Sequence, residues 1–204
     1  LFHHFAPLPL KNQWDSSRAW HRNLLFEQNI LILGKGHIGA HLEKSLTSLC
    51  KNLFFHDPYK GINFDFNQLK NMDVVITAFG LNPSNQNLIN RNFLKNCKET
   101  ILLLHASRGK HVDLREALEF FHSHPKAKAY IDVFPEEPYP IEDIKAQNIN
   151  SSCHVAGVYN HIEDNLIHFE RSVISDFISM NKSEFQKEYF DQNLQNRITT
   201  DFLI

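Results

Sequence analysis

The stretch Ile30-Leu31-Ile32-Leu33-Gly34-Lys35-Gly36-His37-Ile38-Gly39 decides the fold of this chain. Four consecutive apolar residues ended by glycine are typical of a short strand that is buried on both faces. Apolar residues at positions 38, 42, 46 and 49 then recur with a helical period. We therefore expect a strand over residues 30–33, a turn rich in glycine and a helix over residues 38–49.

The rest of the chain repeats this alternation of strands and helices. Apolar runs predict strands over residues 53–55, 73–77, 101–104, 130–133 and 148–154. Periodic patterns indicate a helix or turn over 88–97 and helices over 114–121 and 162–177. Strands separated by helices imply βαβ units, and hence the α/β class with a doubly wound parallel sheet. We expect a loop and a helical turn in residues 1–27, and a polar tail or docking arm in residues 181–204.

Composition limits the classes of protein to consider. The chain has 204 residues, of which 42% are hydrophobic and 22% are charged, which is ordinary for a soluble globular protein. A net charge of −2 gives no electrostatic argument for binding nucleic acid or an anionic membrane. We see no membrane-spanning run and no signal peptide. The chain begins with Leu1 rather than methionine, so a longer natural protein stays open.

Three cysteines, at positions 50, 97 and 153, are far apart and form no CxxC pair. We therefore expect neither a disulfide framework nor a zinc site, and a reducing cytoplasm fits best. His161 and His168 lie seven residues apart on one predicted helix, but two solvated histidines are favoured over a metal site. Cys153 is interpreted as a small structural residue rather than a nucleophile. We predict no metal.

The glycine turn suggests a dinucleotide site. Gly34 lets the chain leave the strand sharply, Gly36 lets the backbone approach a pyrophosphate, and Gly39 lets the helix pack closely. The free N–H groups at the start of the helix then face the phosphates. Asp57 follows Gly39 by 18 residues, where an acid receives the ribose 2′-hydroxyl of NAD and repels the extra phosphate of NADP. The alternative is a glycine turn that binds nothing. It is less favoured because a predicted strand precedes the turn, a predicted helix follows it and Asp57 lies at the expected distance.

Downstream of the turn, Arg108, Glu137 and His154 follow in chain order. A cation for a carboxylate, an acid to tune a histidine and a histidine to move a proton form a set suited to reducing a 2-oxo acid. Each residue has a simpler interpretation. Arg108 could be a surface arginine, His154 is one of 13 histidines, and either neighbouring glutamate could be solvated. Only their order in the chain favours a common site.

Four separate motifs carry a resemblance to a known family. They are the Gly34–Gly39 turn with Asp57; Asp73-Val74-Val75 with Asn87-Leu88-Ile89-Asn90; Ala106-Ser107-Arg108-Gly109 with Val112-Asp113; and Asp132-Val133-Phe134-Pro135-Glu136-Glu137-Pro138 with His154-Val155-Ala156-Gly157. In this order they resemble the D-isomer-specific 2-hydroxyacid dehydrogenases over about residues 29–180. We therefore divide the chain into a connecting segment or remnant of a substrate domain (1–28), a dinucleotide-binding domain of Rossmann type (29–160) and a C-terminal helix and tail (161–204).

The resemblance implies roles for single residues. Arg108 would hold the carboxylate of a small 2-hydroxy or 2-oxo acid, His154 would act as general acid and base, and Glu137 would orient and tune His154. Asp132 would accept a hydrogen bond from the nicotinamide carboxamide. The residues that would bind NAD are Gly34, Gly36, His37, Ile38, Gly39, Asp57, Ala106, Ser107, Asp132 and Gly157. The resemblance also implies a homodimer.

The chain departs from the family pattern in two ways. The usual His-x-Pro and its following Thr are replaced by Ala78-Phe79-Gly80 and Asn82, and Cys153 replaces a proline before the catalytic histidine. Only about 28 residues precede the first predicted strand, so the resemblance implies either a longer natural protein or a relative that lacks most of the N-terminal substrate domain, with Trp14 and Trp20 near the usual tryptophan of the connecting segment. A catalytically silent NAD-binding regulatory or scaffold module is therefore a second hypothesis, and a degraded relative that binds nothing is a third.

Overall fold

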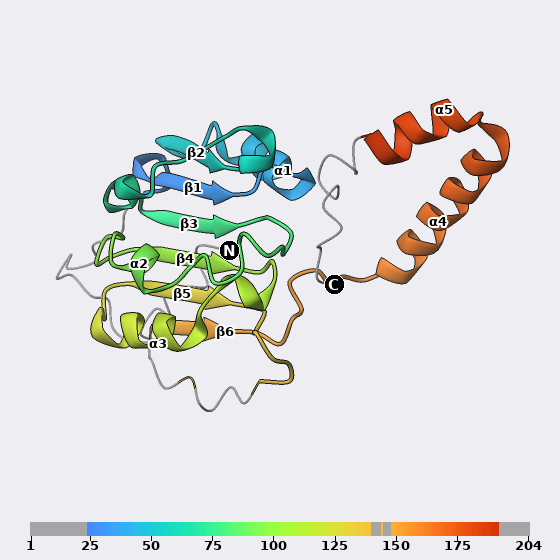
Figure 1. Ribbon diagram of the computed structural model, residues 1–204. Helices are drawn as coiled ribbons and strands as arrows, with labels where there is room; N and C mark the ends of the chain where they lie inside the picture. The colour runs from blue at the N-terminus through green and yellow to red at the C-terminus, as the bar shows by residue number, and fades with distance from the viewer. Residues whose placement is uncertain (1–23, 140–143, 145–147, 192–204) are drawn as a thin grey trace, which may run out of the picture.

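The computed structural model describes residues 24–139, 144 and 148–191. Six strands form one sheet: β1 (Asn29–Leu33), β2 (Asn52–His56), β3 (Val74–Thr77), β4 (Leu102–His105), β5 (Lys128–Ile131) and β6 (Ile149–Ser151). All neighbouring strands are parallel, in the order β2-β1-β3-β4-β5-β6 (Figure 1). The strand order reverses between β1 and β3, and ligands of open α/β sheets bind beyond the carboxyl ends of the strands at such a point.

Helices cover both faces of the sheet, as a doubly wound fold requires. The helices are α1 (His37–Leu46), α2 (Arg91–Leu94) and α3 (Leu114–Ser123), with short 3-10 turns η1 (Leu25–Glu27), η2 (Pro58–Lys60), η3 (Phe66–Asn71) and η4 (Gly109–His111). Leu31 and Leu33 of β1 belong to the core cluster that contains Phe93 of α2 and Phe121 of α3. Ile30 and Ile32 belong to a second cluster, against which Leu42 and Leu46 of α1 pack. Alternate residues of β1 therefore bury opposite faces of the sheet.

The C-terminal part of the described chain extends away from the sheet. It consists of α4 (Ile162–Ser179), α5 (Lys182–Phe185) and the π-helical stretch η6 (Gln186–Asp191), and α4 projects from the sheet as a long arm in Figure 1. α4 has no buried residue, and it packs mainly against α5. Residues 182–191 are thus helical rather than a plain tail, and the capping box formed by Asn181 and Glu184 starts α5.

Several predicted bounds were wrong in informative ways. The fifth strand spans residues 128–131 rather than 130–133, and the last spans 149–151 rather than 148–154. The last strand ends at Ser151, which pairs with Ile131 at the end of β5, and the chain turns at His154, which has φ of 54°. The helical segment over 88–97 shrinks to α2 because the side chain of Asn90 accepts from the N–H groups of Asn92 and Phe93 and fixes its first turn. The predictions for residues 1–23 and 192–204 lie outside the described residues.

Candidate functional site

The glycine turn between β1 and α1 is shaped by close backbone contacts. Gly34 has φ of +105°, and a side chain there would meet the carbonyl oxygen of Ala78 at 2.7 Å. A side chain at Gly39 would collide with the carbonyl oxygen of Gly34. Around Gly36, by contrast, there is open space within 4 Å of where a side chain would be. The turn therefore leaves its outer side open at the N-terminus of α1, where a phosphate can approach free N–H groups.

Asp57 stands directly after β2 and reaches back to this turn. It is only 9% exposed, and its Oδ2 accepts a hydrogen bond of 2.8 Å from the N–H of Lys35. The loop that follows closes on itself, because the backbone of Asp57 forms a bridge with that of Ile62. The acid predicted to meet a ribose therefore lies beside the glycine turn at the carboxyl end of the sheet.

Arg108 lies in the loop between β4 and α3, on the exposed surface. Its Nη1 donates to the carbonyl oxygen of Ser107 at 2.8 Å. Gly109 comes next, and a side chain there would collide with the carbonyl group of Phe134, so the Arg108 loop lies directly against the segment that leads to Glu137. The structure describes Arg108, Glu137 and His154. No hydrogen bond or ion pair joins the side chain of Arg108 to either of the other two.

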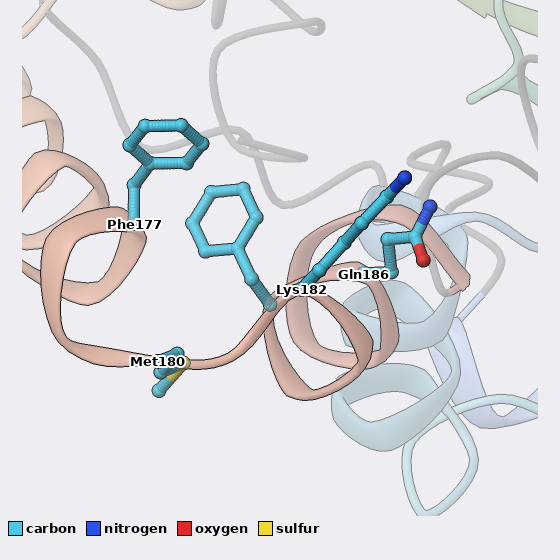
Figure 2. Close-up of a pocket in the computed structure, with 5 residues that line it drawn as sticks. Phe177, Met180, Lys182 and Gln186 are labelled. Atoms are coloured by element: carbon cyan, nitrogen blue, oxygen red, sulfur yellow. The ribbon is translucent and has the colours of Figure 1, made fainter.

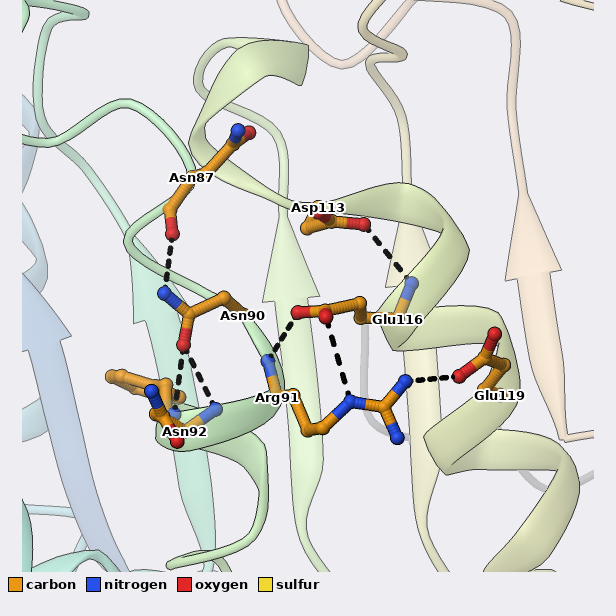
Figure 3. A network of polar contacts seen from close by, with 8 residues as sticks. Asn87, Asn90, Arg91, Asn92, Asp113, Glu116 and Glu119 are labelled. Carbon is orange, nitrogen blue, oxygen red and sulfur yellow. Dashed lines mark hydrogen bonds and ion pairs between the residues drawn. The ribbon is translucent and has the colours of Figure 1, made fainter.

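A polar network joins the start of α2 to α3, the helix that follows the Arg108 loop (Figure 3). The N–H groups of Asn87 and Ile89 donate to the carbonyl oxygens of Lys110 and His111, at 2.8 and 3.0 Å. Asp113 caps α3, and Arg91 of α2 reaches two glutamates of that helix, Glu116 and Glu119. The family motifs quoted from residues 87–90 and 112–113 are thus structural supports for the loop that carries Arg108.

Glu137 and His154 come together from the loops after β5 and β6. His154 Nδ1 lies 2.8 Å from Glu137 Oε2, and the other oxygen of Glu137 accepts from the N–H of Phe134 at 2.8 Å. The hydrogen bond with His154, followed by that from Phe134, lowers the pKa of Glu137. An ionised Glu137 accepts a hydrogen bond from the N–H at Nδ1 of His154, so Nε2 is the ring nitrogen left for chemistry. The side chain of His154 is 54% exposed, which leaves it accessible to a small molecule.

Asp132 fastens the segment that holds His154. The Asp132 side chain is 1% exposed, and it accepts from the hydroxyl of Ser152 and from the N–H groups of Val155 and Ala156, the last two at 2.9 and 3.0 Å. Its backbone oxygen accepts from the N–H of His154 at 2.7 Å. Burial alone would raise the pKa of Asp132, but these donors outweigh it and the pKa is lowered. The strained conformation of His154 is therefore held on both sides by one buried aspartate.

Two histidines that the sequence reasoning missed lie beneath the Arg108 loop. His105, at the end of β4, is 1% exposed, and its Nδ1 lies 3.0 Å from the hydroxyl of Thr77. His111 is 0% exposed, and its Nδ1 lies 3.0 Å from the hydroxyl of Ser107. The Nε2 atoms of both rings are buried without a hydrogen-bond partner among the described residues. The only signal in the sequence was an unusual histidine at the end of an apolar run.

The other predicted residues have clear places. Ala106, Ser107 and Gly157 follow β4 and β6, and Ala106 and Gly157 are exposed. Cys153 is also exposed. Where the family pattern is broken, Asn82 is buried and its side chain accepts from Ser84 and Asn85. The side chain of Asn82 thus shapes this turn. In the same loop, the centre of the Phe79 ring lies 4.2 Å from the centre of the His111 ring.

The described features outside the loops at the carboxyl end of the sheet do not contribute to the candidate site. His161 is not on α4 with His168, as the sequence suggested, but precedes the helix with φ of 69° and lies 3.3 Å from Asp164. Within the described residues, no group of three histidine, cysteine or acidic side chains could hold a metal, and no helix is long and apolar enough to cross a membrane. A hollow of about 460 Å³ lies between α4 and α5, lined by Phe177, Met180, Lys182, Phe185 and Gln186 (Figure 2). It is formed by the C-terminal arm and not by the loops of the sheet.

The glycine turn, the free N-terminus of α1 and Asp57 fit a dinucleotide. The open space at Gly36 admits a pyrophosphate, and Asp57 stands one hydrogen bond from the turn. The fold and these residues define a dinucleotide-binding α/β domain.

Comparison with known proteins specifies the class further. Residues 5–156 match the family model for the NAD-binding domain of D-isomer-specific 2-hydroxyacid dehydrogenases. The chain therefore belongs to this family, and the domain that the family model describes over residues 5–156 is an NAD-binding domain.

Individual relatives agree with this assignment. The chain is 28% identical over 180 residues to a glyoxylate reductase from Pyrococcus horikoshii, covering 76% of this chain and 54% of that protein. It is 30% identical over 149 residues to a D-3-phosphoglycerate dehydrogenase from Escherichia coli K12, covering 66% of this chain and 36% of that protein. The chain thus spans about half the length, or less, of these curated relatives.

Solved structures share the fold at low sequence identity. A D-lactate dehydrogenase from a Sporolactobacillus species superposes with a TM-score of 0.68 at 19% identity, over 82% of this chain and 57% of that one. An NAD-complexed D-isomer-specific 2-hydroxyacid dehydrogenase from Lactobacillus delbrueckii gives 0.66 at 18% identity, over 83% and 58%. The predicted α/β class and parallel sheet are confirmed.

Proposed function

We propose that this protein is an NAD-dependent oxidoreductase that transfers a hydride between the nicotinamide cofactor and a small D-2-hydroxy acid or its 2-oxo partner. The observation that carries the proposal is the 2.8 Å hydrogen bond between His154 and Glu137, in a domain of this family. A histidine whose Nδ1 is held by a carboxylate is set to exchange a proton at Nε2. The other features of the site are consistent with this chemistry.

Each residue has a separate task in the proposed reaction. When bound, NAD supplies the acceptor or donor of the hydride. His154 gives a proton from Nε2 to the substrate oxygen in reduction and takes it back in oxidation, while Glu137 orients the ring and stabilises its charged form. Arg108 binds the substrate carboxylate with two parallel N–H donors. For this it must leave the carbonyl oxygen of Ser107, which a charged ligand outcompetes.

The test is a turnover assay of the 204-residue chain with NADH and a panel of small 2-oxo acids that includes glyoxylate. We expect oxidation of NADH, and we expect His154→Gln to lower kcat by about 10²- to 10⁴-fold, the usual contribution of a general acid–base. NADH affinity of that variant should stay within about twofold, because His154 lies outside the glycine turn. Full activity of His154→Gln would show that the proposed mechanism is wrong.

A second function is favoured by one observation. The guanidinium of Arg108 donates to the carbonyl oxygen of Ser107 and has no hydrogen bond or ion pair with Glu137 or His154, which are both described. This arrangement fits a silent NAD-binding regulatory or scaffold module. Tight NADH binding without turnover of any 2-oxo acid would favour the module over the enzyme.

A further inference from the structure

The loop after β2 places a lysine beside the acid that selects the dinucleotide. Lys60 Nζ donates to the carbonyl oxygen of Lys35 at 2.6 Å. The N–H of the same Lys35 donates to Asp57 Oδ2 at 2.8 Å. Asp57 therefore bonds the backbone N–H of Lys35, and Lys60 bonds the backbone carbonyl oxygen of the same residue. Because the backbone nitrogen and oxygen of a residue are at most about 3.6 Å apart, Lys60 Nζ lies within about 9 Å of Asp57 Oδ2.

Backbone hydrogen bonds fix the place of this lysine. The loop closes through Asp57 and Ile62, whose N–H and carbonyl groups bond at 2.7 and 3.0 Å. The N–H of Lys60 also donates to the carbonyl oxygen of Asp57 at 3.0 Å, and Gly61 takes the left-handed conformation, with φ of 69°, that completes the turn. A cation held on such a short closed loop cannot drift far from Asp57.

The two lysines of this region, Lys35 and Lys60, differ in whether an acidic side chain compensates their charge. Lys35 Nζ forms an ion pair of 2.7 Å with Glu43 and lies 4.6 Å from the ring centre of Phe55. Lys60 takes part in none of the ion pairs between described residues, and the partner of its ammonium is a neutral carbonyl. Its charge is therefore available to an anion that arrives at the ribose end of the site, while that of Lys35 is already compensated.

We propose that Lys60 is a selectivity residue that contacts the 2′-phosphate of NADPH, so that this chain binds NADPH as a second dinucleotide despite Asp57. The inference rests on the proposed use of the glycine turn by NAD. Asp57 repels a 2′-phosphate, and a nearby cation is the feature that accommodates one in dinucleotide domains. The Lys60 ammonium can leave a neutral carbonyl for a doubly charged phosphate, because a charge-assisted bond is the stronger of the two.

The experiment is a fluorescence titration of the 204-residue chain with NADH and with NADPH. Three variants separate charge from hydrogen bonding: Lys60→Met removes both, Lys60→Gln keeps a donor without the charge, and Lys60→Arg keeps both. Lys44→Met, in the last turn of α1, is the matched control that removes one exposed ammonium away from the site.

We expect Lys60→Met and Lys60→Gln to weaken NADPH binding about fivefold and NADH binding less than about twofold, since one exposed charge contact is worth about a factor of five. Lys60→Arg and Lys44→Met should keep the wild-type ratio of the two affinities. Raising the salt concentration to about 1 M should narrow the difference between wild type and Lys60→Met, because exposed charges are screened.

Three outcomes would overturn the inference. Equal loss of both dinucleotides in Lys60→Met would show that Lys60 only holds the glycine turn. Binding of NADH with no detectable binding of NADPH by the wild type would show that Asp57 alone decides selectivity. If the wild type bound neither dinucleotide, the proposed function would fail together with this inference, whereas the first two outcomes leave that function intact.

Discussion

The two buried histidines beneath the Arg108 loop make the stability of this domain depend on pH. Burial lowers the pKa of His105 to about 3, helped by the nearby charge of His111. Burial also lowers the pKa of His111 to about 4, and the guanidinium of Arg108 acts in the same direction. Both rings are therefore neutral in the folded protein at neutral pH, and an acid solution favours the state in which they can be protonated.

The direction and size of the effect follow from linkage. In the unfolded chain both histidines titrate near 6.5, so between that pH and about 3 to 4 the unfolded chain binds two protons that the folded chain does not. Stability is present in full above pH 6.5 and falls as the pH decreases through this window. From pH 7.5 to pH 5 each histidine costs about 2 kcal/mol, and the pair about 4 kcal/mol. That is a large share of the stability of a typical domain, about 5–15 kcal/mol.

Urea unfolding followed by circular dichroism at pH 7.5, 6 and 5 measures this loss. A double variant, His105→Asn with His111→Leu, should lose much less stability between pH 7.5 and 5. Asparagine keeps an acceptor for the hydroxyl of Thr77, and leucine suits the apolar contact with Phe79. His122→Asn, an exposed histidine of α3, is the control and should behave as wild type.

The two acids of the site and His56 do not obscure the result. The pKa values of Asp132 and Glu137 are lowered below 3.8 and 4.5, so their contributions disappear only at pH values below the range measured. Burial also lowers the pKa of His56, which adds to the loss in every variant equally. The reasoning is refuted if the wild type loses less than about 1 kcal/mol between pH 7.5 and 5, or if the double variant loses as much as the wild type.

Three further substitutions test how the site is held. Gly109→Ala should lower the free energy of unfolding by at least about 2 kcal/mol in urea titrations, because the new methyl group meets the carbonyl of Phe134; unchanged stability would contradict the close approach. Asp132→Asn should lower kcat while the NADH affinity stays within about twofold, since the amide cannot serve every donor of the His154 segment; a matching loss of NADH affinity would instead favour a direct contact with the cofactor. Arg91→Met should leave the melting temperature nearly unchanged despite two ion pairs, because these are solvent-exposed; a marked decrease would show that the network carries more of the support for the loop.

Much of the topology could be predicted from the sequence because β1, β3 and β4 contain compact apolar runs. A continuous apolar run could also belong to a buried helix, but these runs are too short for a helix, and glycine or proline follows several of them. The ends of helices and strands were predicted less well where side-chain hydrogen bonds, rather than a change in hydrophobicity, determine where an element begins or ends. The side chain of Asn90 fixes the first turn of α2 by its hydrogen bonds, and the apolar pattern does not reveal this.

The contact between Glu137 and His154 came from the family resemblance, since 17 residues and two loops separate them. The positions of Asp57 and the glycine turn could be predicted directly, because the carboxyl ends of adjacent parallel strands meet at one edge of the sheet. Arg108 shows the limit of this logic. Its place beyond β4 follows from the topology, but the direction of a long exposed side chain depends on hydrogen bonds that no pattern encodes.

The burial of two histidines beneath the site could not be predicted from the sequence, for a physical reason. Histidine is intermediate in its tendency to be buried, so residue type alone does not predict that His105 and His111 are almost fully buried. Only the structure shows that hydroxyl groups of Thr77 and Ser107 satisfy one nitrogen of each ring. Because Ser107 adjoins Arg108, protonation of His111 would disturb the hydroxyl contact next to the proposed carboxylate-binding residue. A loss of stability in acid should therefore begin at the loop on which the proposed function depends.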